Sequence, residues 1–428
     1  MQQANRPGTA EPPRRAGSRA FLTAMVVDTI GAGVWVTFSL LYFTEGRGIP
    51  LSAAGAALST GSVAALVLGG LAAGSFADRV GPYPAAVLSC AIRALVFPAY
   101  LWADGPAQVV AIAFGVSLGD RLYWAAHGGL VAGITSDEQA RRRFFALLNS
   151  LRTMGLGLGA LAVAVGAALE RWFGPAFWTA IPLLNAAGFA FAGVLFWRLG
   201  TRFPRHRGTT AVETGGYRGV FANRRFLAFT GATLALTLAS VAFESILPIY
   251  LRWLGMPLWL PPVAYVLSCL AIPAFQPVAL RWGSGRAPMR LMARSAVLIA
   301  AGLAGFLLLV GRDVPTAALL MVVLVLVFSL GEALFGAVAM VIVLDFAGGS
   351  AAGRYGACYQ LVWGVAGAVG PGLNTVLFAV SGTAPWLVLA VALLAAAFVY
   401  RHLDRTAPPG PDRSRGRAVA RPRRARAR

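Results

Sequence analysis

The sequence of 428 residues is strongly apolar: 58% of its residues are hydrophobic, 12% are charged, and its mean hydropathy is +0.69. This composition lies far outside the range of soluble globular proteins and predicts a protein that crosses a membrane several times. The formal net charge is +21, all 37 basic residues are arginine, and they concentrate in the two tails and one central segment, so we expect contact with anionic lipid headgroups rather than nucleic-acid binding.

Twelve apolar segments follow one another along the chain, and each is close to the length of about 20 residues that a helix needs to cross a membrane. The predicted spans are 20–44, 51–76, 84–102, 107–134, 144–169, 173–197, 226–251, 256–280, 291–310, 316–346, 355–380 and 384–400. The first span is too long for the apolar part of a signal peptide, so we expect it to remain as a membrane helix.

The longest polar break, residues 198–225, divides the spans into six and six. RFFALLN (143–149) resembles RYGACYQ (354–360) at the equivalent place of each half, and the same register pairs Gly159 with Gly370, which indicates an internal duplication. The sequence therefore predicts an all-α membrane protein of two six-helix bundles. Its predicted regions are a basic tail (1–19), a first bundle (20–197), a linker (198–225), a second bundle (226–402) and a basic tail (403–428).

The distribution of arginine predicts the orientation of the chain. With twelve spans and the N-terminus inside, only four loop arginines lie outside: Arg47, Arg171, Arg252 and Arg312. The positive-inside rule therefore predicts that both termini are cytoplasmic. The heavy use of Arg, Ala and Gly is typical of a GC-rich bacterial genome, so we expect a multi-pass protein of the bacterial inner (plasma) membrane that functions as a monomer. The three cysteines lie inside spans, and neither a metal site nor a cofactor is expected.

Two motifs carry a family resemblance. GSFADRVG (74–81) is expected in the loop between the second and third spans, and SDEQARRRFFALLNSLRTMGLGLG (136–159) precedes and enters the fifth. With the twelve spans, these motifs resemble the major facilitator superfamily of secondary transporters over residues 20–402. Pro82 and Tyr83 stand where the family's signature has a basic pair.

The resemblance implies two pseudo-symmetric bundles that rock about a central site, and a cytoplasmic latch between them. Its residues would be Gly74, Asp78, Arg79 and Gly81, with Asp78 accepting from a helix N-terminus or an arginine while the glycines allow close approach. The alternative interpretation is an exposed turn. The glycines of GLGLGA (155–160) are expected to form a close-packing helix face.

Ionisable groups inside the spans are the best pointers to a site, because charge in a bilayer is expensive unless it faces a cavity or a partner. Asp28, Asp120, Glu244 and Glu332 lie on spans one, four, seven and ten, which line the central cavity in the family that this chain resembles. Asp28, Glu244 and Glu332 are the candidates for proton coupling, since desolvation and a nearby arginine together control the protonation of a carboxylate. Each is alternatively a static ion-pair partner.

Further polar and aromatic residues are candidates for the wall of the substrate cavity. On span seven, Thr230, Thr233, Thr237, Ser240 and Glu244 are spaced 3, 4, 3 and 4 and share one helix face, although such hydroxyls also bond to their own backbone. The candidates are Asp120, Arg121, Tyr123, Trp124, His127, Asn149, Arg152, Thr233, Thr237, Ser240, Gln360 and Trp363.

Four arginines lie inside the predicted spans, and each has its own expected role. Arg121 is turned about 100° from the face that Asp120 and His127 share, and it is placed to reach an acid on span one or a substrate. For Arg152 the alternative to substrate contact is a salt bridge to Asp120 or Asp28. Arg93 is interpreted, like Arg294, as an arginine near a span end that snorkels to the interface, with no role in the site.

These features predict a secondary transporter that moves a small organic solute by alternating access, as a proton-coupled exporter of a drug-like compound or metabolite. An importer or uniporter of the same fold is the first alternative. A second alternative, of another class, is a non-transporting sensor or a lipid-modifying intramembrane enzyme. The sequence has three histidines and no HExxH motif, which disfavours the enzyme, and the missing P-loop pattern disfavours ATP-driven transport.

Overall fold

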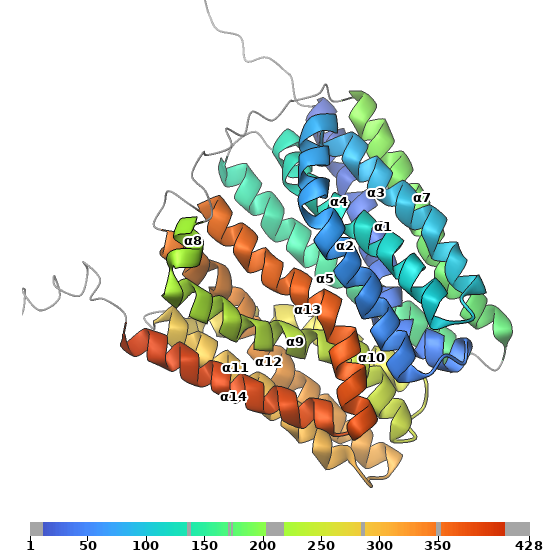
Figure 1. Ribbon diagram of the computed structural model, residues 1–428, viewed down its shortest axis with the longest axis vertical. Coiled ribbons are helices and arrows are strands. Elements are labelled where there is room, and N and C mark those ends of the chain that lie inside the picture. Colours follow the sequence, from blue (N-terminus) through green and yellow to red (C-terminus); the bar gives the residue numbers. More distant parts are fainter. Residues whose placement is uncertain are drawn as a thin grey trace, which may run out of the picture.

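The computed structural model describes residues 12–134, 138–169, 172, 174–202, 218–283, 287–347 and 352–406, and these residues form helices joined by short connections, with no strand among them. Twelve of the described helices are long and apolar enough to cross a membrane (Figure 1). The predicted series of twelve spans is therefore confirmed, and the chain is a multi-pass membrane protein.

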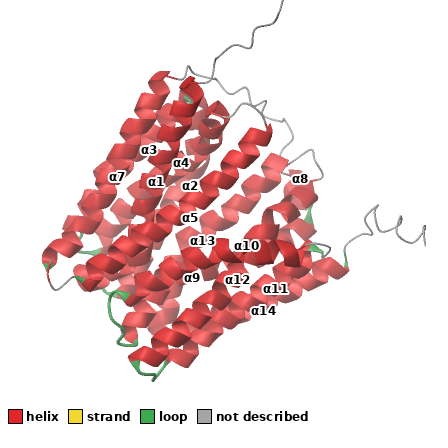
Figure 2. Cartoon of the chain, turned by 180° about the vertical axis from the view of Figure 1, so that it is seen from behind, coloured by secondary structure: helices red, strands yellow, loops and turns green. Residues whose placement is uncertain are grey.

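The spanning helices agree closely with the predicted segments. The first six are α1 (Pro12–Leu41), α2 (Leu51–Val80), α3 (Pro82–Val96), α4 (Pro106–Ile134), α5 (Glu138–Ala168) and α7 (Pro175–Arg202). The second six are α9 (Arg224–Trp253), α10 (Leu260–Gly283), α11 (Pro288–Gly305), α12 (Val314–Ala347), α13 (Ala352–Val380) and α14 (Ala384–Arg405). The chain also has the π-helix η1 (Tyr42–Gly46), the 3₁₀ helices η2 (Phe97–Trp102) and η3 (Phe306–Leu309), and the short helix α8 (Arg218–Ala222). Figure 2 shows α8 as a short helix at the edge of the molecule.

The third spanning helix of each half changes its winding near its end. α3 gives way to the 3₁₀ helix η2 after Val96, and α11 gives way to η3 after Gly305. In η2 the change coincides with Pro98, which has no N–H for the α-helical ladder and whose ring crowds the preceding turn. In η3 no proline is present, and the tighter turn is the ordinary way in which a helix end satisfies its carbonyls.

The prediction that GSFADRVG forms a loop is wrong. Residues 74–80 continue α2, and Gly81 alone separates α2 from α3. Gly81 has φ +95°, a conformation that residues with a Cβ rarely adopt, and its N–H donates to the Ala77 carbonyl at 2.9 Å. Pro82 then starts α3, where its missing N–H is not needed. The turn therefore needs a single residue, because glycine ends one helix and proline begins the next.

Helices extend into the range 198–225, which is the predicted linker, from both sides. α7 extends through Arg202, and α8 occupies part of the range 198–225 immediately before α9. Residues 203–217 lie outside the described part of the structure.

The pairing of helices repeats between the two halves of the series. Among the first six, α1 contacts α5 and α7, α2 contacts α4, and α3 contacts α4 and α7. Among the second six, α9 contacts α13 and α14, α10 contacts α12, and α11 contacts α12 and α14. Each pair of the first set has its counterpart six spans later in the second set. Contacts between the sets run from α2 to α13, from α5 to α10 and from α1 to α9.

Glycine allows the closest of these approaches. A Cβ on Gly159 of α5 would overlap the carbonyl oxygen of Ile30 on α1, and a Cβ on Gly370 of α13 would lie 2.5 Å from the Val241 side chain on α9. The two glycines that the repeat aligns thus pack against the first helix of their own halves. Gly155 also faces α1, so the predicted close-packing role of the GLGLGA segment is confirmed.

Candidate functional site

A cavity of about 220 Å³ lies among helices of both halves of the series. Its polar wall contains three carboxylates, two guanidiniums, an imidazole and a carboxamide, and its apolar wall is rich in aromatic rings. The charged, imidazole and carboxamide residues are Asp28, Arg93, Asp120, His127, Arg152, Asn185 and Glu244, and the six-membered or fused aromatic residues are Trp35, Phe97, Tyr123, Trp124, Phe189 and Tyr265. Glu244 on α9 and Tyr265 on α10 are the second half's contribution.

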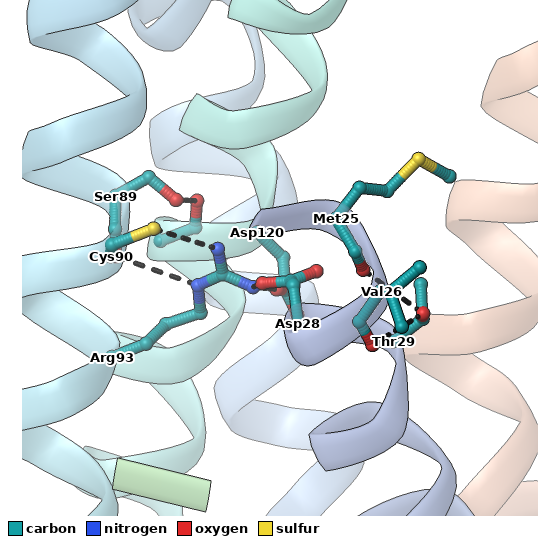
Figure 3. Close-up of polar contacts among 9 residues, drawn as sticks. Met25, Val26, Asp28, Thr29, Ser89, Cys90, Arg93 and Asp120 are labelled. Carbon is teal, nitrogen blue, oxygen red and sulfur yellow. Dashed lines mark hydrogen bonds and ion pairs between the residues drawn. The ribbon is translucent and has the colours of Figure 1, made fainter. Parts of the chain in front are cut away.

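Arg93 on α3 holds two carboxylates from two other helices (Figure 3). Its Nη1 lies 3.1 Å from Oδ1 of Asp28 on α1 and 3.1 Å from Oδ1 of Asp120 on α4. The contact with Asp120 has hydrogen-bond geometry, whereas Asp28 Oδ1 is an ion-pair partner that accepts no hydrogen bond among the described residues. One guanidinium thus serves two acids.

The prediction that Arg93 snorkels toward a membrane interface is wrong, because only 3% of its side chain is exposed. The guanidinium carbon lies 4.2 Å from the centroid of the Phe189 ring and 5.4 Å from that of Tyr123, so aromatic faces complete its surroundings. Its Nη2 also donates to Cys90 Sγ at 3.8 Å. Arg93 faces inward because its ion-pair partners lie on α1 and α4, within the bundle.

Asp28 and Asp120 differ in exposure. The Asp28 side chain is 11% exposed, whereas the Asp120 side chain is 48% exposed and faces the cavity. When both are ionised, this cluster has one more negative charge than Arg93 neutralises.

Arg152 and Glu244 form the other charged part of the cavity. The Arg152 guanidinium carbon lies 5.3 Å from the centroid of the Trp124 ring, and Glu244 accepts a hydrogen bond of 3.4 Å from the Tyr265 hydroxyl. Two acids predicted as alternative partners of Arg152, Asp28 and Asp120, are instead held by Arg93. Arg152 therefore lies on the cavity wall beside the Trp124 ring.

The polar residues of α4 lie on two different faces of the helix, as their spacing predicts. Asp120, Tyr123, Trp124 and His127 all line the cavity. Arg121 is turned toward α13, where a Cβ on Gly364 would lie 2.8 Å from its Nη1. It thus reaches the other half of the helix series instead of an acid on α1.

The hydroxyl stripe on α9 does not line this cavity. Thr233 and Thr237 are fully buried, and their hydroxyls donate to the carbonyls of Phe229 and Thr233 within the same helix. Thr233 also shares a 3.0 Å hydrogen bond with the Tyr400 hydroxyl of α14. The alternative interpretation, in which the hydroxyls bond to their own helix, applies because this face of α9 packs against α14.

Ser240 and Glu332 form a separate contact between helices. The Ser240 hydroxyl on α9 lies 2.9 Å from Oε1 of Glu332 on α12, and Glu332 is half-buried outside the cavity. This serine joins the two helices and does not face the cavity.

The remaining predicted residues lie elsewhere. Gln360 is exposed on α13, and Trp363 stacks on Phe335 of α12 with ring centroids 6.0 Å apart. Arg79 is exposed in the last turn of α2. The side-chain surroundings of Gly74, Asp78 and Asn149 lie outside the described part of the structure.

Asn185, Tyr265 and Arg93 line the cavity although the sequence patterns did not mark them as site residues. Asn185 on α7 is 1% exposed, its Nδ2 donates to the Ile181 carbonyl at 3.0 Å, and its Oδ1 accepts no hydrogen bond from any described residue. A carboxamide inside an apolar span, like a charged group there, indicates a polar partner or a cavity. Asn185 could therefore have been predicted as a site residue from the sequence. Tyr265 carries no comparable signal in its sequence context.

Polar contacts connect the first and second halves of the chain near one end of the helices. Arg252 at the end of α9 forms a bidentate ion pair with Glu45 of η1, with N–O distances of 2.9 and 3.3 Å. Near the same end, the Gly372 N–H on α13 donates to Ser59 Oγ on α2 at 2.7 Å. Figure 1 shows α2 and α13 converging toward this end. An ion pair and a hydrogen bond therefore join helices of the two halves near this end.

Comparison with known proteins places this geometry in a family. The model of the Major Facilitator Superfamily matches residues 20–325, which is well over half of the chain. No curated protein sequence matches the chain.

Solved structures give the same fold. A mutant of the nucleoside transporter NupG superposes with a TM-score of 0.75 at 14% identity, covering 90% of this chain and 99% of that one. An auto-inhibited peptide transporter of the POT family superposes with a TM-score of 0.71 at 13% identity, covering 92% and 98%. A structure described for proton-dependent oligopeptide transporters gives 0.66 at 14% identity, covering 91% and 100%. At these identities the likeness establishes the fold alone, and the family match carries the assignment: the chain belongs to the Major Facilitator Superfamily and is a membrane transporter, not an enzyme.

Proposed function

We propose that this chain is a proton-coupled secondary transporter that exports a small organic solute by alternating access. The observation that carries the proposal is the sharing of Arg93 by Asp28 and Asp120 on the wall of a cavity to which both halves contribute. Two acids with one guanidinium form a site whose charge changes by one when a single proton binds.

The coupling chemistry follows from that imbalance. When one carboxylate of the pair takes up a proton, Arg93 is left paired with the other, and the electrostatic attraction that holds α1, α3 and α4 together changes. A proton that crosses with the potential contributes about 2.3 kcal/mol per 100 mV, which is enough to bias a rocking equilibrium. Glu244 and Glu332 remain further candidates for proton sites, since Glu244 lines the cavity and Glu332 links α12 to α9.

Alternating access requires two units that move against each other. We assign these units to residues 20–197 and 226–402, and the repeated pairing of helices in the two sets supports this assignment. The end joined by Glu45 and Arg252 would be the extracellular gate, with both termini and the Gly74, Asp78, Arg79 and Gly81 latch at the cytoplasmic end. The distribution of arginine supports that orientation.

The proposal extends to the surroundings of the protein. The chain would function as a monomer in the bacterial inner membrane, with the arginine-rich segments 1–19, 198–225 and 403–428 on anionic lipid headgroups. Protons and the solute would be its other partners.

Reconstitution into proteoliposomes tests transport and coupling separately. Purified protein is screened by counterflow, without a pH gradient, against radiolabelled nucleosides, dipeptides and small organic ions. A solute that exchanges is then offered under an imposed pH gradient, and we expect wild-type protein to move it against its concentration gradient, toward the side from which protons come. Asp28→Asn is expected to keep counterflow and lose the response to the gradient. A protein that exchanges no solute in the screen, or one in which the response persists in Asp28→Asn, Glu244→Gln and Glu332→Gln alike, contradicts the proposal.

A further inference from the structure

Two hydrogen-bond acceptors on the cavity wall lack a donor among the described residues. Asn185 Oδ1 is buried and accepts no hydrogen bond from the described residues, and Asp28 Oδ1 has an ion-pair contact but no hydrogen bond. The carboxylate of Asp120 is half-exposed toward the cavity. A buried acceptor left without a donor costs about 1–3 kcal/mol, so a ligand that donates several hydrogen bonds would be favoured here.

The charges of the wall also favour a cation. Its three carboxylates, Asp28, Asp120 and Glu244, face two guanidiniums. Arg93 is already shared between the first two acids, and Arg152 lies over the Trp124 ring. An incoming positive group therefore meets an excess of carboxylate, whereas an incoming anion has Arg152 as its one available cation on this wall.

The apolar part of the wall sets the size and shape of the ligand. Trp124 lines the cavity and is half-exposed, and Trp35, which also lines it, stacks on Tyr100 with ring centroids 4.7 Å apart. Aromatic faces attract both apolar groups and cations. A cavity of about 220 Å³ is smaller than the roughly 300–1,000 Å³ of drug-sized pockets, and larger than the roughly 150 Å³ that accommodates benzene.

We infer that this cavity binds a primary amine in its ammonium form, attached to one aromatic or similarly compact apolar body, and that this is the class of solute which the protein moves. The ammonium group donates to Asp120 and Asn185, and the ring lies against Trp124. The inference rests on the proposed function, because it takes the cavity to be the transport site.

Binding to the purified full-length protein in lipid nanodiscs tests the inference directly. Radiolabelled 2-phenylethylamine is the probe at pH 7, where its amine is protonated. Its competitors are 2-phenylethanol and 3-phenylpropanoate, which keep the ring and replace the ammonium with a neutral or an anionic group. We expect saturable binding of the amine, and at least tenfold weaker competition by both analogues than by unlabelled amine.

Matched variants connect binding to the wall. Asp120→Asn keeps the shape of the side chain and is expected to weaken amine binding at least tenfold, and Asn185→Leu at least threefold. Asp104→Asn is the control, because Asp104 is an exposed acid that pairs with Arg47 in the connection before α4, away from the cavity. Size-exclusion profiles that match wild type establish that the variants are folded.

The outcomes separate this inference from the proposed function. Equal or tighter binding of 3-phenylpropanoate, or no saturable binding of the amine to folded wild-type protein, overturns the amine class. Counterflow of a nucleoside or a dipeptide without any exchange of amine overturns the inference and leaves the transporter proposal intact. Amine binding that depends on Asp120 but is never accompanied by exchange supports the binding site and contradicts transport.

Discussion

Arg93 shows how much a single intramembrane residue depends on its neighbours in space. Its side chain is buried between α3 and two neighbouring helices, and Asp28 on α1 and Asp120 on α4 both contact its Nη1. Removing the guanidinium leaves two carboxylates close together with no cation between them, and an uncompensated buried charge is among the most destabilising changes that one substitution can make.

Arg93→Met is therefore expected to lower the free energy of unfolding by about 3 kcal/mol or more. Thermal unfolding of the detergent-solubilised protein, followed by intrinsic fluorescence, measures the change. Arg294→Met is the matched control, because Arg294 is an exposed arginine on α11, the third spanning helix of the other half. Equal unfolding midpoints for the two variants would show that Arg93 does not stabilise this cluster.

Ser240 allows a similar comparison within one helix. Ser240→Ala removes the hydroxyl that donates a hydrogen bond to Glu332 on α12, and leaving a buried acceptor without its donor costs about 1–3 kcal/mol. Ser245→Ala is the control, since the Ser245 hydroxyl donates to the Val241 carbonyl of its own helix. We expect Ser240→Ala to lower the unfolding midpoint clearly more than Ser245→Ala, and the opposite order would contradict a stabilising link between α9 and α12.

At the scale of the helices, two helices pack closely where glycine leaves no side chain between their backbones. α1 and α5 approach at Gly155 and Gly159, and the backbone of Ile30 occupies the space where a Gly159 side chain would lie. Backbone atoms cannot rotate away as a flexible side chain does, so the helices themselves would have to separate.

Gly159→Ala is expected to destabilise the protein by about 1–3 kcal/mol through overpacking. The control is Gly367→Ala on α13, where an added Cβ meets no atom within 4 Å and the change is expected to be neutral or slightly stabilising. Chemical unfolding in mixed detergent micelles compares the two variants. A Gly159→Ala protein as stable as the Gly367→Ala protein would contradict the observed helix approach.

Helices are also the scale at which sequence prediction works best and then stops. The twelve spans were predictable because the length and continuity of an apolar run are properties of one segment alone. The partners of Arg93 and the burial of Thr233 were not, because helical spacing tells which residues share a face but not which helix lies against that face. The helical course of residues 74–80 was missed since Gly81 and Pro82 make a turn of one residue, shorter than a loop motif suggests.

For the whole molecule, the pair of Glu45 and Arg252 is one of the polar contacts between the two halves, at the end where η1 meets α9. Both side chains are about one-third exposed, so the pair contributes up to about 1 kcal/mol, enough to change the ratio of closed to open molecules by up to about fivefold.

Glu45→Gln is expected to shift the protein toward opening at this end. Spin labels at Leu95 and Val380, which are 79% and 80% exposed, report the separation of the halves by pulsed electron paramagnetic resonance after the native cysteines are replaced. We expect the longer distances to gain population in Glu45→Gln and to remain unchanged in the control Asp104→Asn. Identical distance distributions in wild type and Glu45→Gln would show that this pair does not hold the end closed.

The central claim is that one proton, bound where Asp28 and Asp120 share Arg93, drives a solute across the membrane. The most direct measurement is solute accumulation in proteoliposomes under an imposed pH gradient, with a solute first identified by counterflow. The account predicts that wild-type protein concentrates the solute beyond equilibrium until a protonophore collapses the gradient, and that Asp28→Asn exchanges the solute but no longer concentrates it. Accumulation by Asp28→Asn equal to that of wild type would contradict this account.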